Sequence, residues 1–193
     1  MKVTKEQREL NKEKILTAAS HLYREHGIEG IGIGELSKSV GLTHGGFYRQ
    51  FPQGKDQLVA EAIQRTFDEY CEFWSTLASA SEVVHSYVNH EHCQSKHDAC
   101  PIPTLAADVA RVGGAPREAY TRGVKRMVEL LMAKKGDLVE GTSEKQAMQM
   151  LASAAGAMII ARASSCPELA EKFMAAVLEQ WDAPSPAPEA IRD

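Results

Sequence analysis

Apolar residues recur three or four positions apart along most of the chain, and no segment alternates apolar and polar residues as a half-buried β-strand does. This spacing predicts a first helix over residues 5–26, begun by the capping box Thr4-Lys-Glu-Gln7 and ended by Gly27. A helix over residues 55–80 carries a long apolar stripe. The stripe consists of Val59, Ile63, Phe67, Tyr70 and Trp74.

The rest of the chain is predicted to be helical as well. Two short helices fit within residues 34–51, and further helices are predicted at 82–93, 103–112, 116–135, 142–165 and 167–182. The Pro-rich segment 183–193 is predicted to be disordered. The fold class that follows is all-α, with about nine helices.

Residues 34–58 form the most informative stretch of the chain. Leu36 and Val40 lie four residues apart on the first short helix, and Phe47 and Phe51 do so on the second. Gly41 suits the left-handed conformation of a tight turn between the helices. The pattern predicts a helix-turn-helix whose second helix presents polar and aromatic side chains outward, as a DNA-reading helix does.

The segment Gly41-Leu-Thr-His-Gly-Gly-Phe-Tyr-Arg-Gln-Phe51 resembles the recognition segment of the TetR family of bacterial transcriptional repressors. The resemblance covers residues 4–62 by motif and the rest by length and helical organisation. Phe51-Pro-Gln-Gly-Lys55 has one residue more than the commonest family form and is similar to the variant in the branch of LmrA-like and QacR-like drug-responsive repressors. Gly32 stands where many members have a Thr or Ser cap.

The motif assigns DNA-binding roles to six residues. Thr43, Tyr48 and Lys55 are expected to contact phosphates, which fix the register on DNA. His44 is expected at a base edge, with Arg49 available for guanine. A small residue such as Gly45 lets the helix approach DNA closely. The set is Thr43, His44, Gly45, Tyr48, Arg49 and Lys55.

The body of the chain is rich in aromatic and methionine residues. Each one alone is most simply a core residue, but together they resemble the lining of an apolar ligand pocket. The family resemblance implies that a small-molecule effector, apolar or aromatic, binds in this body. The predicted ligand-binding residues are Phe67, Tyr70, Trp74, Tyr87, Cys100, Tyr120, Met127 and Met158.

The loop His90–Cys100 holds three histidines and two cysteines. Its spacing matches no compact zinc knuckle, and we predict no metal site and no cofactor. Cys100 precedes Pro101 at a predicted helix start, where a thiol pKa is lowered. One alternative is therefore a redox- or electrophile-sensing repressor acting through Cys100. A second, of another class, is a small thiol or metal enzyme that uses the loop, although no paired acid and base or cofactor fingerprint supports an enzyme.

The predicted helix 142–165 has a centre rich in Ala, Gly and Ser, which lets helices approach closely. The family resemblance implies that the last two helices form a homodimer interface, so that two heads bind a palindromic operator. We therefore expect residues 1–54 to form the DNA-binding domain and 55–182 the ligand-binding and dimerisation domain, followed by a disordered tail at 183–193.

Charge and composition agree with a DNA-binding head. The 193 residues carry a net charge of −4. Residues 1–56 contain nine Lys and Arg against seven Asp and Glu, whereas residues 57–193 contain 13 against 19. No apolar run approaches the roughly 20 residues of a membrane span, and the N-terminus is too polar for a signal peptide, so a cytoplasmic protein is expected.

Overall fold

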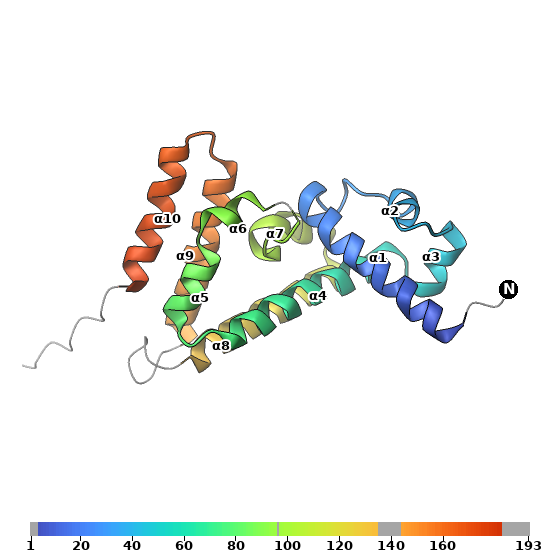
Figure 1. Ribbon diagram of the computed structural model, residues 1–193, viewed down its shortest axis with the longest axis horizontal. Coiled ribbons are helices and arrows are strands. Elements are labelled where there is room, and N and C mark those ends of the chain that lie inside the picture. Colours follow the sequence, from blue (N-terminus) through green and yellow to red (C-terminus); the bar gives the residue numbers. More distant parts are fainter. Residues whose placement is uncertain (1–3, 96, 135–143, 183–193) are drawn as a thin grey trace, which may run out of the picture. The chain divides into compact units, whose positions relative to one another are not determined.

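The computed structural model describes residues 4–95, 97–134 and 144–182, and within these residues it contains ten helices and no strand (Figure 1). The all-α prediction is confirmed. Among the described residues, no helix is both long and apolar enough to cross a membrane. The helices are α1 Lys5–His26, α2 Ile33–Ser39, α3 His44–Gln50, α4 Lys55–Thr76, α5 Ala80–Tyr87, α6 His90–Gln94, α7 Pro101–Val112, α8 Gly114–Ala133, α9 Glu144–Ala163 and α10 Pro167–Asp182.

The first helix begins and ends where the sequence predicts. The Thr4 hydroxyl accepts the backbone N–H of Gln7 at 3.1 Å, and Gly27 ends the helix at φ 78°. The Gln7 side chain also donates to Asn11 Oδ1 at 3.0 Å, one turn further along α1.

Two predicted boundaries are wrong in the middle of the chain. α4 ends at Thr76 and not near residue 80, because Ser79 caps α5 by accepting the N–H of Glu82 at 3.1 Å. The predicted single helix 82–93 is two helices, because the Asn89 side chain accepts the N–H of His92 at 2.8 Å and begins α6. Half of the predicted His/Cys loop is therefore helical. The start of the predicted helix 142–165 and the tail 183–193 lie outside the described residues.

The chain divides into two compact units. Unit 1 is Met1–Glu72 with Ser95–Met127, and unit 2 is Phe73–Gln94 with Val128–Asp193. Unit 1 therefore holds α1–α3 and α7, whereas unit 2 holds α5, α6, α9 and α10, and both α4 and α8 continue from one unit into the other. The expected functional boundary at residue 54 falls inside unit 1 and stays a prediction.

Candidate nucleic-acid interface

The helix-turn-helix is built on a small apolar core under α2 and α3. Leu36, Phe47 and Phe51 are fully buried, and the Phe47 and Phe51 rings lie 5.3 Å apart. Gly41 has φ 71°, a left-handed conformation that residues with a Cβ rarely adopt. Its neighbour Leu42 donates its N–H to Ser37 O at 2.8 Å, which closes the turn between the two helices.

The predicted DNA-binding residues of α3 share its outer face. His44, Gly45, Tyr48 and Arg49 are all exposed, whereas Phe47 between them is buried. Thr43 caps the helix, since its hydroxyl accepts the N–H of Gly46 at 3.1 Å. The cap uses the Thr43 oxygen as an acceptor and leaves its proton for another group, such as a phosphate oxygen. Figure 1 shows α3 joined to α2 by the short turn.

Tyr48 is held by rings on both sides. Its ring centroid lies 5.1 Å from that of His44 and 5.3 Å from that of Phe47, both in edge-on geometry. Edge-to-face contacts of this kind fix the orientation of an aromatic ring. Tyr48 remains 43% exposed. The contacts therefore hold the Tyr48 ring while much of it stays accessible to a partner.

Lys55 begins α4, directly after Gly54 at φ 77°. Its ammonium lies 3.6 Å from the Glu29 carboxylate, and its side chain is 24% exposed. A cation at a helix N-terminus adds its charge to the helix dipole, a favourable combination for a phosphate. In the free protein the negative charge beside the Lys55 ammonium comes from the Glu29 carboxylate.

Five predicted ligand-binding residues lie in unit 1. The Phe67 and Tyr120 rings meet edge-on at 5.6 Å, and Met127 is fully buried. Burial raises the pKa of Tyr120 to about 12, with a further contribution from nearby Cys100. The Tyr70 hydroxyl donates to Asp98 O at 2.6 Å.

The other three predicted ligand-binding residues lie in unit 2. Trp74, Tyr87 and Met158 are buried, and the Trp74 and Tyr87 rings lie 5.7 Å apart in edge-on geometry. Trp74 is 2% exposed, and its Nε1 donor has no hydrogen-bond acceptor among the residues that the structure describes. An unmet buried donor costs about 1–3 kcal/mol. The set thus contains two aromatic pairs, Phe67 with Tyr120 in unit 1 and Trp74 with Tyr87 in unit 2.

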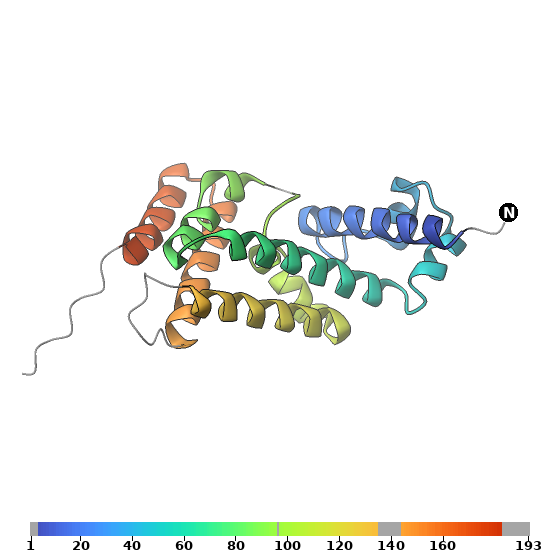
Figure 2. The same cartoon turned by 60° about the horizontal axis from the view of Figure 1, so that its bottom comes forward.

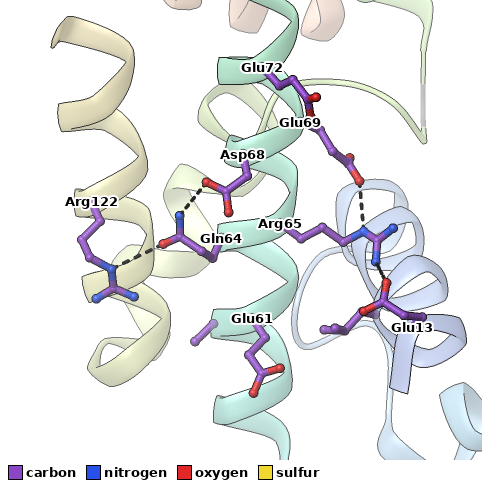
Figure 3. A pocket seen from close by; sticks show the side chains of 10 residues that line it. Glu13, Glu61, Gln64, Arg65, Asp68, Glu69, Glu72 and Arg122 are labelled. Carbon is purple, nitrogen blue, oxygen red and sulfur yellow. Dashed lines mark hydrogen bonds and ion pairs between the residues drawn. The ribbon is translucent and has the colours of Figure 1, made fainter. Parts of the chain in front are cut away.

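A groove of about 520 Å³ on unit 1 has a different character (Figure 3). Its walls come from α1, α4 and α8, and most of its side chains are charged. The Arg65 guanidinium binds Glu13 at 2.5 Å and Glu69 at 3.0 Å, and Arg122 donates to Gln64 at 3.4 Å. No predicted ligand-binding residue lines this groove, and its polarity does not suit an apolar effector.

The His/Cys segment does not converge on one point. His90 pairs with Glu171 at 3.0 Å and His92 is buried against Tyr87 O at 2.6 Å, both in unit 2. His97, in unit 1, lies 3.3 Å from Glu25. Across the described part of the chain, no group of three or more His, Cys, Asp or Glu is placed to hold a metal ion.

Cys100 caps α7 and is buried. The Ile102 N–H donates to its sulfur at 3.5 Å, which places the thiol at the N-terminus of a 12-residue helix. Burial lowers the pKa of the nearby Arg24 guanidinium, and the negative groups around it, Cys100 among them, oppose that shift.

Sequence reasoning missed two polar residues that tie α1 to α7. Arg24 is 7% exposed, and the Asp108 carboxylate accepts the N–H of Ile28 at 3.1 Å. Arg24 directly follows the buried Tyr23, so it falls near the inner face of the predicted first helix. A charged residue at that position is the signal that was available, because such groups are rarely buried without partners.

Comparison with known proteins gives one matching family model and two relatives. Residues 15–62 match the family model described as bacterial regulatory proteins, tetR family. The HTH-type transcriptional regulator LmrA of Bacillus subtilis is 28% identical over 124 residues, which cover 60% of this chain and 65% of LmrA. The uncharacterized HTH-type transcriptional regulator YxaF of the same organism is 38% identical over 56 residues, 29% of each protein.

Solved structures share the whole fold. Escherichia coli NemR in its reduced form superposes with a TM-score of 0.73 at 21% identity, over 86% of this chain and 94% of that one. A TetR family regulator of Agrobacterium tumefaciens gives 0.69 at 18% identity, over 90% and 98%. LmrA, YxaF and the Agrobacterium tumefaciens protein are each described as transcriptional regulators, so the comparisons do not support the enzyme alternative. Residues 15–62 therefore carry the DNA-binding segment of the TetR family of bacterial regulatory proteins, and the described chain shares the fold of solved TetR family regulators.

Proposed function

We propose that the protein is a cytoplasmic repressor that binds a palindromic operator as a homodimer and releases it when a small apolar or aromatic effector binds. The outer face of α3 is the observation that carries DNA binding. It presents His44, Tyr48 and Arg49 around the open position Gly45, above a fully buried Phe47. A reading helix needs this combination of exposed hydrogen-bonding side chains and a rigid apolar base.

The direct test is to select DNA from a random pool with the purified protein and to sequence what it retains. We expect a two-fold symmetric site, with the half-sites about one helical turn apart or a multiple of it. The matched control is the double variant His44→Ala and Arg49→Ala. It removes the expected base contacts and leaves the buried Phe47 of the core in place. Retention of random sequences by the wild-type protein would contradict an operator-specific regulator.

The homodimer proposal is supported by the surface of α9 and α10. The two helices pack side by side in unit 2 (Figures 1 and 2). Large apolar side chains remain exposed on both of them. They are Met148, Ile159 and Ile160 on α9 with Leu169 and Phe173 on α10. Such a patch, adjoining the open position Gly156, suits the interface of a two-fold dimer.

The effector proposal is supported by Trp74. Its unmet Nε1 donor favours an effector that carries a hydrogen-bond acceptor on an apolar or aromatic frame. Release follows as a population shift, in which the effector prefers head positions that misfit the operator and α4, continuous from Lys55 to Thr76, carries the change.

Indole fluorescence gives a test of the effector site. The chain has two tryptophans, and the Trp181 Nε1 already donates to Ser153 Oγ at 3.0 Å. In a Trp181→Phe background, Trp74 is the single tryptophan, so a panel of aromatic acceptors such as quinolines can be titrated against its indole emission. We expect quinoline to change Trp74 emission and to lower operator affinity, whereas naphthalene, which lacks the acceptor, should act more weakly. Equal effects of the two compounds would contradict the role of Nε1.

A second candidate is thiol sensing through Cys100, and its place beside Arg24 at the start of α7 favours it. Against it, the thiol is fully buried, so a reagent can reach it only when the structure opens. The test is an operator titration before and after mild peroxide, with wild type and Cys100→Ser. Release by the wild type alone supports the sensor, and equal behaviour of both proteins leaves the effector proposal by itself.

A further inference from the structure

Asp98 and Ala99 lie just before α7 in unit 1, and a hydrogen bond holds the backbone carbonyl of each. Asp98 O accepts the Tyr70 hydroxyl at 2.6 Å, and Ala99 O accepts the Arg24 guanidinium at 3.1 Å. Tyr70 belongs to α4, whereas Arg24 belongs to α1 of the helix-turn-helix domain. Asp98 and Ala99 are therefore tied to α4 and α1 within unit 1.

Arg24 is well suited to hold this connection. It is 7% exposed, and its Nε donates to Ser20 O at 2.7 Å, one turn back on α1. The guanidinium is planar and rigid, so a bond to Ser20 at one nitrogen fixes the direction of the bond to Ala99 at another. Hydrogen bonds from charged donors are roughly twice as strong as neutral ones. A shift of the Ala99 backbone therefore pulls on the C-terminal turn of α1.

A second tie lies at the end of the same helix. The Ile28 N–H donates to Asp108 Oδ2 of α7 at 3.1 Å, and the other oxygen of Asp108 pairs with Arg111. Gly27 makes this approach possible, because it has φ 78° and a Cβ there would lie 2.8 Å from Asp108 Oδ2. Figures 1 and 2 show α7 beside the C-terminal end of α1. We call the contacts of Arg24 with Ala99 and of Ile28 with Asp108 the α1–α7 junction.

We propose that Arg24 and Asp108 are positioning residues for operator binding, because the α1–α7 junction fixes the orientation of α1 and, through α1, the orientation of the DNA-reading helix. The inference rests on the proposed function as a regulator. α1 packs on α2, and α2 on α3, all within unit 1. The buried Leu36 and Phe47 join these helices into one apolar core, so a turn of α1 moves α3 with it. Loosening the junction leaves the head folded but free to adopt orientations that the operator must then correct.

The test uses four variants of the full chain and the operator that the wild type selects. Asp108→Ala removes the acceptor of the Ile28 N–H, and Asp108→Asn keeps an acceptor oxygen. Arg111→Ala is the matched control, since it removes the ion pair but leaves the bond to Ile28. Arg24→Met keeps much of the apolar stem of the side chain while removing its donors, so that the Ala99 carbonyl loses this hydrogen bond. Operator affinity is measured by fluorescence anisotropy, and folding by urea denaturation.

We expect operator affinity to fall roughly tenfold in Asp108→Ala and in Arg24→Met, the scale of one hydrogen bond to a charged group. Arg111→Ala and Asp108→Asn should stay within about twofold of wild type. If Asp108→Ala and Arg24→Met, shown to be folded, bind as tightly as Arg111→Ala, the inference is overturned while the proposed function stands. If the wild type selects no operator at all, the proposed function fails first.

A measurement on the wild type alone covers the case in which the variants do not fold. Operator binding should slow hydrogen exchange at the Ile28 amide, because it selects the orientation in which the bond to Asp108 is made. Exchange that is unchanged at Ile28, while the amides of α3 become protected, would show that the junction does not respond to DNA and would overturn the inference.

Discussion

Gly45 is the residue of the reading helix whose presence the single chain does not explain. It is the second residue of α3, it is exposed, and its φ is not in the left-handed region. A Cβ built there would meet no heavy atom within 4 Å. Gly46 differs, because a Cβ there would lie 3.3 Å from the Thr43 hydroxyl oxygen that caps the helix. Glycine within a helix costs up to about 1 kcal/mol relative to alanine.

Gly45→Ala should therefore have opposite effects on folding and on DNA binding. The free protein should gain up to about 1 kcal/mol, which raises the Tm by roughly 2–4 °C in a chain of this size. On the operator, the added methyl group must fit where the helix surface meets DNA. Overpacking typically costs roughly 1–3 kcal/mol, or about 5- to 160-fold in affinity for each reading helix.

Gly34→Ala is the matched control, because Gly34 is the second residue of α2 and its Cβ also meets no heavy atom within 4 Å. Both variants should melt at or above the wild-type temperature in a calorimeter. Operator affinity, measured by anisotropy at fixed salt, should fall in Gly45→Ala and change little in Gly34→Ala. If Gly45→Ala binds as tightly as Gly34→Ala, Gly45 is not a point of close approach and the assignment of the reading face is wrong.

Three further predictions test other parts of the proposal. Lys55→Ala should weaken the binding of operator and of random DNA alike, and it should flatten the dependence of affinity on salt concentration by about one. Glu29→Gln should strengthen both kinds of binding, because it removes the ion pair of Lys55; an effect on one DNA sequence only would contradict a phosphate contact. Gly156→Leu should leave the single chain folded, since a Cβ there meets no heavy atom within 4 Å. It should weaken the dimer, measured by sedimentation, by roughly 1–3 kcal/mol for each overpacked position. A native chain that sediments as a monomer at micromolar concentration would refute the interface. The pKa of Tyr120 is raised to about 12, so this phenol ionises at lower pH in the unfolded chain than in the folded one. The stability that this adds should be full below about pH 10 and should fall by up to roughly 1.4 kcal/mol per pH unit between 10 and 12. Tyr120→Phe should reduce this fall in urea titrations.

Local signals in the sequence account for most of the helices and also for the errors. The turn at Gly41 and the cap at Thr43 were predictable because each acts within four residues. The break at Asn89 rests on an equally local cap, but the apolar residues of 82–88 masked it, since helical periodicity continues across the break. Periodicity locates helices well and their ends poorly, because a single side-chain oxygen decides where a helix starts.

Long-range contacts set the limit for the candidate site. The exposure of Tyr48 follows from its place between Phe47 and Phe51, whose spacing is visible in the sequence. The hydrogen bond from Arg24 to Ala99 joins residues 75 positions apart, and the sequence around one of them does not indicate that it contacts the other. The same holds for the ligand-binding set, whose members were chosen by residue type and which the fold divides between two units. Residue type predicts that a side chain is buried more readily than it predicts which side chains meet.

Glycines separate what the chain explains by itself from what it leaves to a partner. At Gly123 a Cβ would lie 2.2 Å from the Phe67 ring, so glycine there is required by packing within unit 1. Gly45 and Gly156 have no such neighbour. Open space alone does not identify an interface, because Gly34 is equally open. What distinguishes Gly45 and Gly156 is their setting, since one lies among exposed hydrogen-bonding residues of α3 and the other among exposed apolar residues of α9. Each setting suits a different partner, DNA for α3 and a second copy of the chain for α9, and a helix that keeps a glycine at such a position gives up about 1 kcal/mol of its own stability for that contact.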